Sequence, residues 1–384
     1  MALAWALAPL LVALPFWTAG VSATASGATA AYGSPLNALF EAVSALTSTG
    51  LTVTTDAGDL PRSLQWWRSL LQWVGGVGVL YLALALVPEA GVASHRAELD
   101  AEMGSERALG QRDLVGVWAL YTSYTGMTIL AFVVTGMPLW EAVNHGMTAL
   151  ATGGFDVTGT SFAAYGPAAR TVCAVAMVLG AVSFGVHLAV VVRRRVRVAG
   201  ADRQVRLGAG LLVAGSLALW ASASGVLSLG DAAFQWTSAL ATAGFSTTSL
   251  NAWGPVPMLV LVGAMVVGGS SGSTAGGFKL GRLVALASPE GPRRAALRQL
   301  GRVAAALAAG TVLLVVLTEA APLAALFETA SALSTVGLTA GVTGPELEPG
   351  GRLVLIGLMW MGRLEIAAAI ALLVRGLGPA VPES

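Results

Sequence analysis

The chain has 384 residues, of which 55% are hydrophobic and only 11% are charged, and its formal net charge is +1. Soluble domains carry about 25% charged residues, so the composition excludes a soluble globular protein, and we expect no nucleic-acid partner. Cys173 is the only cysteine, which excludes internal disulfides, and the three histidines show no metal-ligand spacing. Because no catalytic constellation is visible, we expect neither an enzyme nor a bound cofactor.

Apolar runs long enough to cross a membrane recur along the chain. A helix of about 20 apolar residues spans a hydrocarbon core of ~30 Å, and eight runs lie near 4–22, 68–87, 114–135, 170–192, 208–229, 256–268, 303–320 and 352–374. The sequence therefore predicts an all-α polytopic membrane protein with eight spans. The first run could also be a signal peptide, but its start lacks Lys and Arg, and the repeats described next require it as a span.

A short sequence occurs four times, each time between two apolar runs. The copies are FEAVSALTSTGLT from Phe40, NHGMTALATGGFD from Asn144, FQWTSALATAGFS from Phe234 and FETASALSTVGLT from Phe327. The segment before each glycine is far too short to cross a bilayer. We therefore expect four parallel repeats of helix, re-entrant pore loop and helix, with boundaries at 1–92, 93–199, 200–292 and 293–384.

Two arginine-rich segments, 193–206 and 282–302, follow the second apolar run of repeats 2 and 3. Short arginine-rich loops stay in the cytoplasm, so the re-entrant loops should face outward and both chain termini should be cytoplasmic. The same segments are candidate surfaces for a cytosolic partner, and binding of anionic membrane lipids is the simpler explanation.

Four re-entrant segments in one chain can meet around a pseudo-fourfold ion pore. Non-helical backbone at membrane depth must be buried or line water, and rings of carbonyls can replace the hydration shell of a cation. Glycine allows the unusual dihedrals needed there. Close helix packing by small residues is the alternative, and four matched copies disfavour it. The predicted ion-binding residues are Ser48, Thr49, Gly50, Thr152, Gly153, Gly154, Thr242, Ala243, Gly244, Thr335, Val336 and Gly337.

The sixth apolar run turns into glycine and hydroxyl residues in the stretch MVVGGSSGSTAGGFKL, Met265 to Leu280. Each glycine costs a helix interior about 1 kcal/mol relative to alanine, so the helix should break there. The resulting loop survives at membrane depth only where it lines a cavity. A phosphate-binding loop is the rival interpretation, but the Gly-Lys-Ser/Thr ending is absent.

Charged residues near the pore loops carry further expectations. Arg363 lies in the last apolar run, where a charge costs about 2.5–3.5 kcal/mol, so it should point into a water-filled cavity or at backbone carbonyls; a structural arginine satisfied by neighbouring helices is the alternative. Lys279, the only lysine, is either a snorkelling cation or part of a gate. We place Glu41 and Glu328 at the starts of their short helices.

The chain resembles the bacterial Trk/Ktr potassium-uptake subunits, of the TrkH and KtrB kind, within the superfamily of K⁺ transporters. The resemblance runs from about Leu7 to Leu373. It is carried by the four glycine motifs, by GGSSGSTAGGFK in repeat 3, and by MGRLE (361–365) in repeat 4. LATGGF (150–155) and HRAE (95–98) are more similar to the Trk branch, whereas the absence of two additional N-terminal helices is closer to the KtrB kind.

The resemblance implies potassium uptake across the bacterial inner (plasma) membrane, with K⁺ as the transported ion at the predicted ion-binding residues. It also implies a homodimer and a cytosolic nucleotide-binding regulatory subunit of the TrkA or KtrA kind. In the family, an intramembrane loop below the filter and an arginine that protrudes into the pore act as the gate. The matching residues here are Gly268, Gly269, Ser270, Ser271, Gly272, Ser273, Thr274, Ala275, Gly276, Gly277 and Arg363.

Other functions stay open at this point. The protein could transport Na⁺ or mixed monovalent cations, or couple a cation to H⁺. Glycine in all four filter positions favours K⁺, because in related eukaryotic transporters a serine in the first position accompanies sodium permeation. A carrier with alternating access is disfavoured, since such folds often use inverted repeats. A non-conducting membrane scaffold would have no need of four intact glycines.

Overall fold

The computed structural model describes residues 2–22, 25, 27–85, 113–223, 225–250 and 253–364. Within these ranges the regular structure is all-helical, without a β-strand, which confirms the predicted all-α class. The HRAE motif (95–98), Met1 and residues 365–384 lie outside the described residues. The cytoplasmic location of both chain termini stays a prediction.

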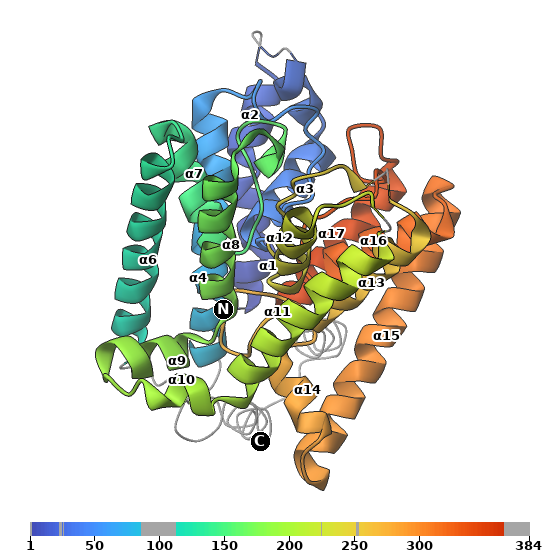
Figure 1. Ribbon diagram of the computed structural model, residues 1–384. Helices are drawn as coiled ribbons and strands as arrows, with labels where there is room; N and C mark the ends of the chain where they lie inside the picture. The colour runs from blue at the N-terminus through green and yellow to red at the C-terminus, as the bar shows by residue number, and fades with distance from the viewer. Residues whose placement is uncertain are drawn as a thin grey trace, which may run out of the picture.

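The helices follow one order four times: one or two helices, a twelve-residue helix, a loop, and one or two further helices. The successive groups are α1 (Ala2–Val12), α2 (Leu14–Gly20), α3 (Pro35–Leu46) and α4 (Arg62–Ala85); α6 (Leu114–Val134), α7 (Leu139–Leu150), α8 (Pro167–Ala181) and α9 (Phe184–His187); α10 (Arg197–Ala201), α11 (Arg203–Ser222), α12 (Leu229–Leu240), α13 (Pro255–Val267) and α14 (Leu280–Leu286); and α15 (Glu290–Thr318), α16 (Pro322–Leu333) and α17 (Pro349–Leu364). In Figure 1, α6 and α15 lie at opposite edges, and the short helices lie between them.

Three of the described helices are long and apolar enough to cross a membrane: α6, α11 and the part of α15 from Pro292 to Thr318. A fourth span results if the bent pair Pro167–Ala181 and Phe184–Val192 is counted as one. These helices make the chain a membrane protein. The eight spans and the four repeat boundaries stay predictions.

The composition of the apolar run near 170–192 suggested one straight helix, but the structure has a bend within this run. The chain bends by 97° between α8 and the segment that starts at Phe184. At this break the Ala181 carbonyl accepts from the amide of Ser270 (2.9 Å), and the Phe184 amide donates to the carbonyl of Gly272 (2.9 Å). The bend is possible because a loop from repeat 3 satisfies backbone groups that a continuous helix would pair internally.

The α-helix that follows each of three glycine motifs crosses the end of a short helix at a glycine. A Cβ built on Gly75, Gly180 or Gly362 would overlap the carbonyl oxygen of Leu46, Leu150 or Leu333, respectively. Each of these leucines is the last residue of its twelve-residue helix. The missing side chain therefore lets one backbone lie directly against another, as at close helix contacts in membranes.

We predict that Gly75→Ala lowers the melting temperature of the detergent-solubilised protein by several degrees, because backbone must move to admit the methyl group, at a cost of about 1–3 kcal/mol. Gly263→Ala is the matched control: Gly263 also lies within an α-helix, in α13, but a Cβ there meets nothing within 4 Å. Equal melting temperatures for the two variants would contradict the close crossing.

Candidate functional site

The chain after each short helix adopts the same backbone path. A hydroxyl residue two positions past the helix has a left-handed φ, and so does the glycine two positions further on. The φ values lie between 51° and 53° at Ser48, Thr152, Thr242 and Thr335, and between 75° and 96° at Gly50, Gly154, Gly244 and Gly337. Left-handed backbone is unfavourable for residues other than glycine, so four equivalent occurrences indicate one repeated, tightly constrained loop.

One backbone hydrogen bond closes each of these loops onto its own helix. The amide of the residue before the glycine donates to the carbonyl five positions earlier, at 2.8–2.9 Å in all four copies. The donor and acceptor pairs are Thr49 and Ser44, Gly153 and Thr148, Ala243 and Ser238, and Val336 and Ser331. The C-terminal end of each helix, which carries partial negative charge, is thereby fixed beside its glycine.

The four glycines meet in a closed ring. A Cβ built on each glycine would overlap one carbonyl oxygen of the next repeat, and the fourth repeat returns to the first. The contacts are Gly50 with Gly153, Gly154 with Ala243, Gly244 with Val336, and Gly337 with Thr49. We call these four glycines and four carbonyls the glycine ring. The structure thus brings all twelve predicted ion-binding residues together, one set of three from each repeat.

Exposure within the glycine ring follows one pattern. The four glycines are half-buried, whereas the residue before each of them is buried. A hollow of about 210 Å³ lies beside two of the glycines, and it is lined by glycine residues, hydroxyl side chains and two leucines. Its residues are Gly244, Ser246, Thr248, Ser249, Leu250, Gly337, Leu338, Thr339 and Gly341. Carbonyl and hydroxyl oxygens without a fixed charge are a chemistry suited to a monovalent cation.

Four side chains at equivalent helix positions are buried, and all of them except His145 form hydrogen bonds with the chain beyond the glycines. Glu41, His145, Gln235 and Glu328 are all fully buried. The Glu41 carboxylate accepts from the Thr52 hydroxyl (2.8 Å), and the Gln235 side-chain oxygen accepts from the Thr247 amide (2.9 Å).

The carboxylate of Glu328 accepts hydrogen bonds from the Thr339 and Thr343 hydroxyl groups and from the Ala340 amide. The prediction that Glu41 and Glu328 start their helices is wrong: α3 and α16 begin earlier, at Pro35 and Pro322. Proline is favoured in the first helical turn, so this signal was present in the sequence. Both carboxylates hold the returning chain rather than the helix end.

Arg68 of α4 joins the loops of repeats 1 and 2, and the sequence did not single it out. Its side chain is 1% exposed, and Nε lies 2.8 Å from a carboxylate oxygen of Glu41. Nη1 donates to the Asp156 carbonyl (3.1 Å), and the guanidinium lies over the Phe155 ring at 3.9 Å from its centroid. One buried cation therefore contacts the chain beyond both glycines, Gly50 and Gly154.

Three acidic residues that follow the glycines of repeats 1 and 2 differ in their surroundings. Asp56 and Asp59 are exposed. Asp156 is half-buried, and its carboxylate accepts from the Ser161 amide (2.6 Å) and the Thr158 hydroxyl (3.3 Å). The carboxylate of Asp156 thus shapes its own loop.

The helix of repeat 3 breaks at its glycines, since α13 ends at Val267 and α14 begins at Leu280. The intervening residues 268–279, the glycine-rich loop, contact the chain at the base of the glycine ring. The Gly276 amide donates to the Thr242 hydroxyl (2.7 Å), and the Thr274 hydroxyl donates to the Leu150 and Gly180 carbonyls (3.1 and 2.9 Å).

Arg363 fixes the glycine-rich loop from the other side. Its guanidinium, which is buried, donates to the Thr274 carbonyl (2.8 Å) and to the Gly75 and Gly76 carbonyls (2.8 and 3.0 Å). Of the two expected surroundings, a water-filled cavity and backbone carbonyls, the structure has the carbonyls. Lys279 is the last residue of the loop, and its ammonium group donates to the Ala275 carbonyl.

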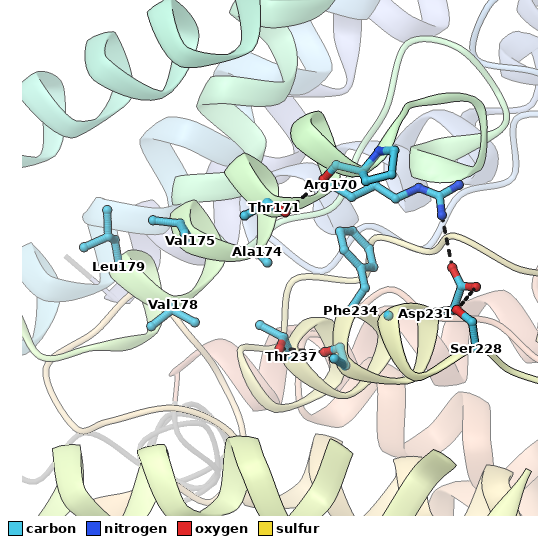
Figure 2. A pocket seen from close by; sticks show the side chains of 13 residues that line it. Arg170, Thr171, Ala174, Val175, Val178, Leu179, Ser228, Asp231, Phe234 and Thr237 are labelled. Atoms are coloured by element: carbon cyan, nitrogen blue, oxygen red, sulfur yellow. Dashed lines mark hydrogen bonds and ion pairs between the residues drawn. The ribbon is translucent and has the colours of Figure 1, made fainter. Parts of the chain in front are cut away.

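A larger groove lies to the side of the ring, between α8 and α12, with a volume of about 600 Å³. Figure 2 shows its apolar wall, with Val175, Val178 and Leu179 toward one end and the ion pair of Arg170 and Asp231 (3.1 Å) at the other. The lining is mainly apolar, with hydroxyl groups at Thr171, Ser228 and Thr237, so this groove differs in its chemistry from the glycine ring.

The fold and these loops define a polytopic helical membrane protein of the cation-transport class. The TrkH family, described as cation transport proteins, matches residues 14–214, 211–290 and 294–376. The chain therefore belongs to the TrkH family, which confirms the resemblance to the Trk/Ktr potassium-uptake subunits.

Relatives and a solved structure agree with this assignment. The chain is 30% identical to the Trk system potassium uptake protein TrkH of Halomonas elongata, over 97% of this chain and 83% of that protein. It is 31% identical to the protein of the same name from Escherichia coli (strain K12), over 65% of this chain and 54% of that protein. The crystal structure of the potassium transporter TrkH from Vibrio parahaemolyticus matches with a TM-score of 0.77 and 25% identity, covering 97% of this chain and 84% of that one.

We predict that Arg68→Met destabilises the protein by about 3–5 kcal/mol, because it leaves the buried Glu41 carboxylate without its cationic partner. Adding Glu41→Gln removes that charge while keeping an acceptor for Thr52, so the double variant should recover most of the lost stability. Thermal unfolding of both variants in detergent measures this. A double variant less stable than Arg68→Met would contradict a pairing role.

Proposed function

We propose that the protein takes up potassium ions across the bacterial inner membrane through the glycine ring. The observation that carries the proposal is the closure of the ring, in which each glycine lies against a carbonyl of the next repeat. A ring of carbonyl oxygens can replace the water lost by a cation that enters. The names of the relatives, Trk system potassium uptake proteins, favour K⁺ as the ion.

The surroundings of the ring support selective passage of a cation. The C-terminal ends of four short helices lie at its base, and their partial negative charges stabilise a cation there. The hydroxyl-lined hollow beside Gly244 and Gly337 supplies further oxygens at the ring. K⁺ would enter from the outside, lose water at the ring and continue toward the cytoplasm, driven by the membrane potential.

The glycine-rich loop and Arg363 are the proposed gate. The loop contacts the base of the ring through Gly276 and Thr274, and Arg363 binds the carbonyl of Thr274. A fixed positive charge at this place would repel a cation that leaves the ring. Opening requires the loop to move away from Thr242 and Leu150, whose hydrogen bonds with it would break.

The membrane topology, the homodimer and regulation by a cytosolic nucleotide-binding subunit belong to the same proposal. They rest on the family and on the arginine-rich segments 193–206 and 282–302. Of these, Arg193 is 44% exposed at its side chain and pairs with Asp113. The alternative function is transport of Na⁺ or mixed monovalent cations, which the same carbonyl chemistry would permit.

Uptake of ⁸⁶Rb⁺ into liposomes that contain the purified protein tests the function. We expect uptake driven by a K⁺ gradient, little uptake under a Na⁺ gradient, and a severalfold weaker discrimination in Gly50→Ser, because a side chain there displaces the Gly153 carbonyl. Gly136→Ser is the control, since Gly136 also has a positive φ (90°) but open space around it. Equal uptake under both gradients in the wild type would support the mixed-cation alternative.

The gate is tested by Arg363→Ala in the same liposomes. Removing the charge and three hydrogen bonds should raise K⁺-dependent uptake severalfold in the absence of any partner subunit. Arg352→Ala is the control on the same helix, α17, since Arg352 binds the Pro345 carbonyl away from the loop. Unchanged uptake in a folded Arg363→Ala variant would refute the role of Arg363 as a brake.

A further inference from the structure

One carbonyl of the glycine ring has a partner that the other three lack. The side-chain amide of Gln72, on α4, donates to the carbonyl of Gly153 (2.5 Å) and accepts from the amide of Phe155 (3.1 Å). It therefore bridges the backbone on both sides of Gly154. Among the residues that the structure describes, the carbonyls of Thr49, Ala243 and Val336 accept no side-chain hydrogen bond.

Gln72 also binds the loop of its own repeat. Its backbone carbonyl accepts from the hydroxyl of Ser48 (2.9 Å), which lies two residues before Gly50. The residue is fully buried, so water does not compete for either contact. A single residue thus fixes the spacing between the chain segments that repeats 1 and 2 contribute to the ring.

The corresponding position in the other three repeats is methionine. Gln72 lies three residues before Gly75, and Met177, Met265 and Met359 lie three residues before Gly180, Gly268 and Gly362. All three methionines are fully buried. Met177 packs in one cluster with Ala243, and Met265 packs in one cluster with Val336. The equivalent position therefore carries a buried apolar thioether in three repeats and a hydrogen-bonding amide in one.

The amide also explains a glycine that the repeats do not require. Position 153 is glycine, whereas the equivalent residues are Thr49, Ala243 and Val336. A Cβ built on Gly153 would collide with the side-chain amide of Gln72. The first glycine of LATGGF, Gly153, is thus the counterpart of Gln72, and the two residues form one unit across the boundary between repeats 1 and 2.

We infer that Gln72 is a specificity-determining positioning residue, which holds the Gly153 carbonyl so that the ring favours K⁺ over the smaller Na⁺. The inference rests on the proposed function of the ring. A carbonyl that already accepts a strong hydrogen bond offers less electron density to an ion and cannot move inward to contact a smaller one. Both the distance and the field strength of coordinating carbonyls affect selectivity among monovalent cations.

The experiment replaces Gln72 by the residue that the other repeats carry. Gln72→Met should lower the K⁺ to Na⁺ permeability ratio about five- to tenfold, measured from reversal potentials in planar bilayers, while K⁺ still permeates. Gln65→Met is the matched control: Gln65 is also buried on α4, but it binds Trp140 and the Ala57 carbonyl, away from the ring. This control should keep the wild-type ratio even if its melting temperature falls.

A second variant covers the case in which Gln72→Met does not fold. Gln72→Met with Gly153→Ala reproduces the combination of residues that the chain already has at the equivalent positions 177 and 243, which belong to one buried cluster, and it should show the same loss of selectivity. A wild-type ratio in either folded variant overturns the role of Gln72. If neither variant folds, Gln72 is a stabilising core residue and the specificity role is withdrawn. Absence of cation permeation in the wild type and also in Arg363→Ala would instead refute the proposed function.

Discussion

The structure depends on the mutual approach of four backbones at Gly50, Gly154, Gly244 and Gly337. No side chain fits at these positions, because the carbonyl of the next repeat occupies the space where a Cβ would lie. Each short helix must end at the ring with the same left-handed turn. The helices that cross those ends must have a glycine at the crossing point. The glycines of the following helices, Gly75 among them, satisfy this second requirement.

Backbone that leaves helical structure inside a membrane needs partners from the protein, since the surrounding hydrocarbon supplies none. Buried polar side chains, most of them from other repeats, meet this need around the ring. Arg68 and Gln72 of α4 bind the loop of repeat 2, Glu328 binds the returning chain of repeat 4, and Arg363 binds carbonyls of α4 and of the glycine-rich loop. The polar groups that stabilise the loops are therefore the groups that set the positions of the candidate ion ligands.

Much of this architecture could be predicted from the sequence, because its signals are local. Apolar runs indicated helices, and four copies of a glycine motif located the twelve residues that the ring brings together. The glycine-rich stretch from Gly268 indicated where α13 ends. The family assignment, which rested on the same motifs, is confirmed.

The contacts between repeats could not be predicted, because they join residues far apart in the chain. Nothing in the single sequence pairs Arg68 with Asp156 or Gln72 with Gly153. The 97° bend after α8 was missed for the same reason, since it depends on hydrogen bonds from the glycine-rich loop of another repeat. The buried position of Glu41 was missed because Pro35 was not read as the helix start.

The most direct test of the account is a crystal structure of the protein in Rb⁺, with the ion located by its anomalous scattering. The account predicts density on the axis of the glycine ring, within coordination distance of the carbonyls of Thr49, Gly153, Ala243 and Val336. Replacement of Rb⁺ by Na⁺ should remove the density. Rb⁺ bound only away from the ring, or a ring closed to ions in every condition that supports transport, would contradict it.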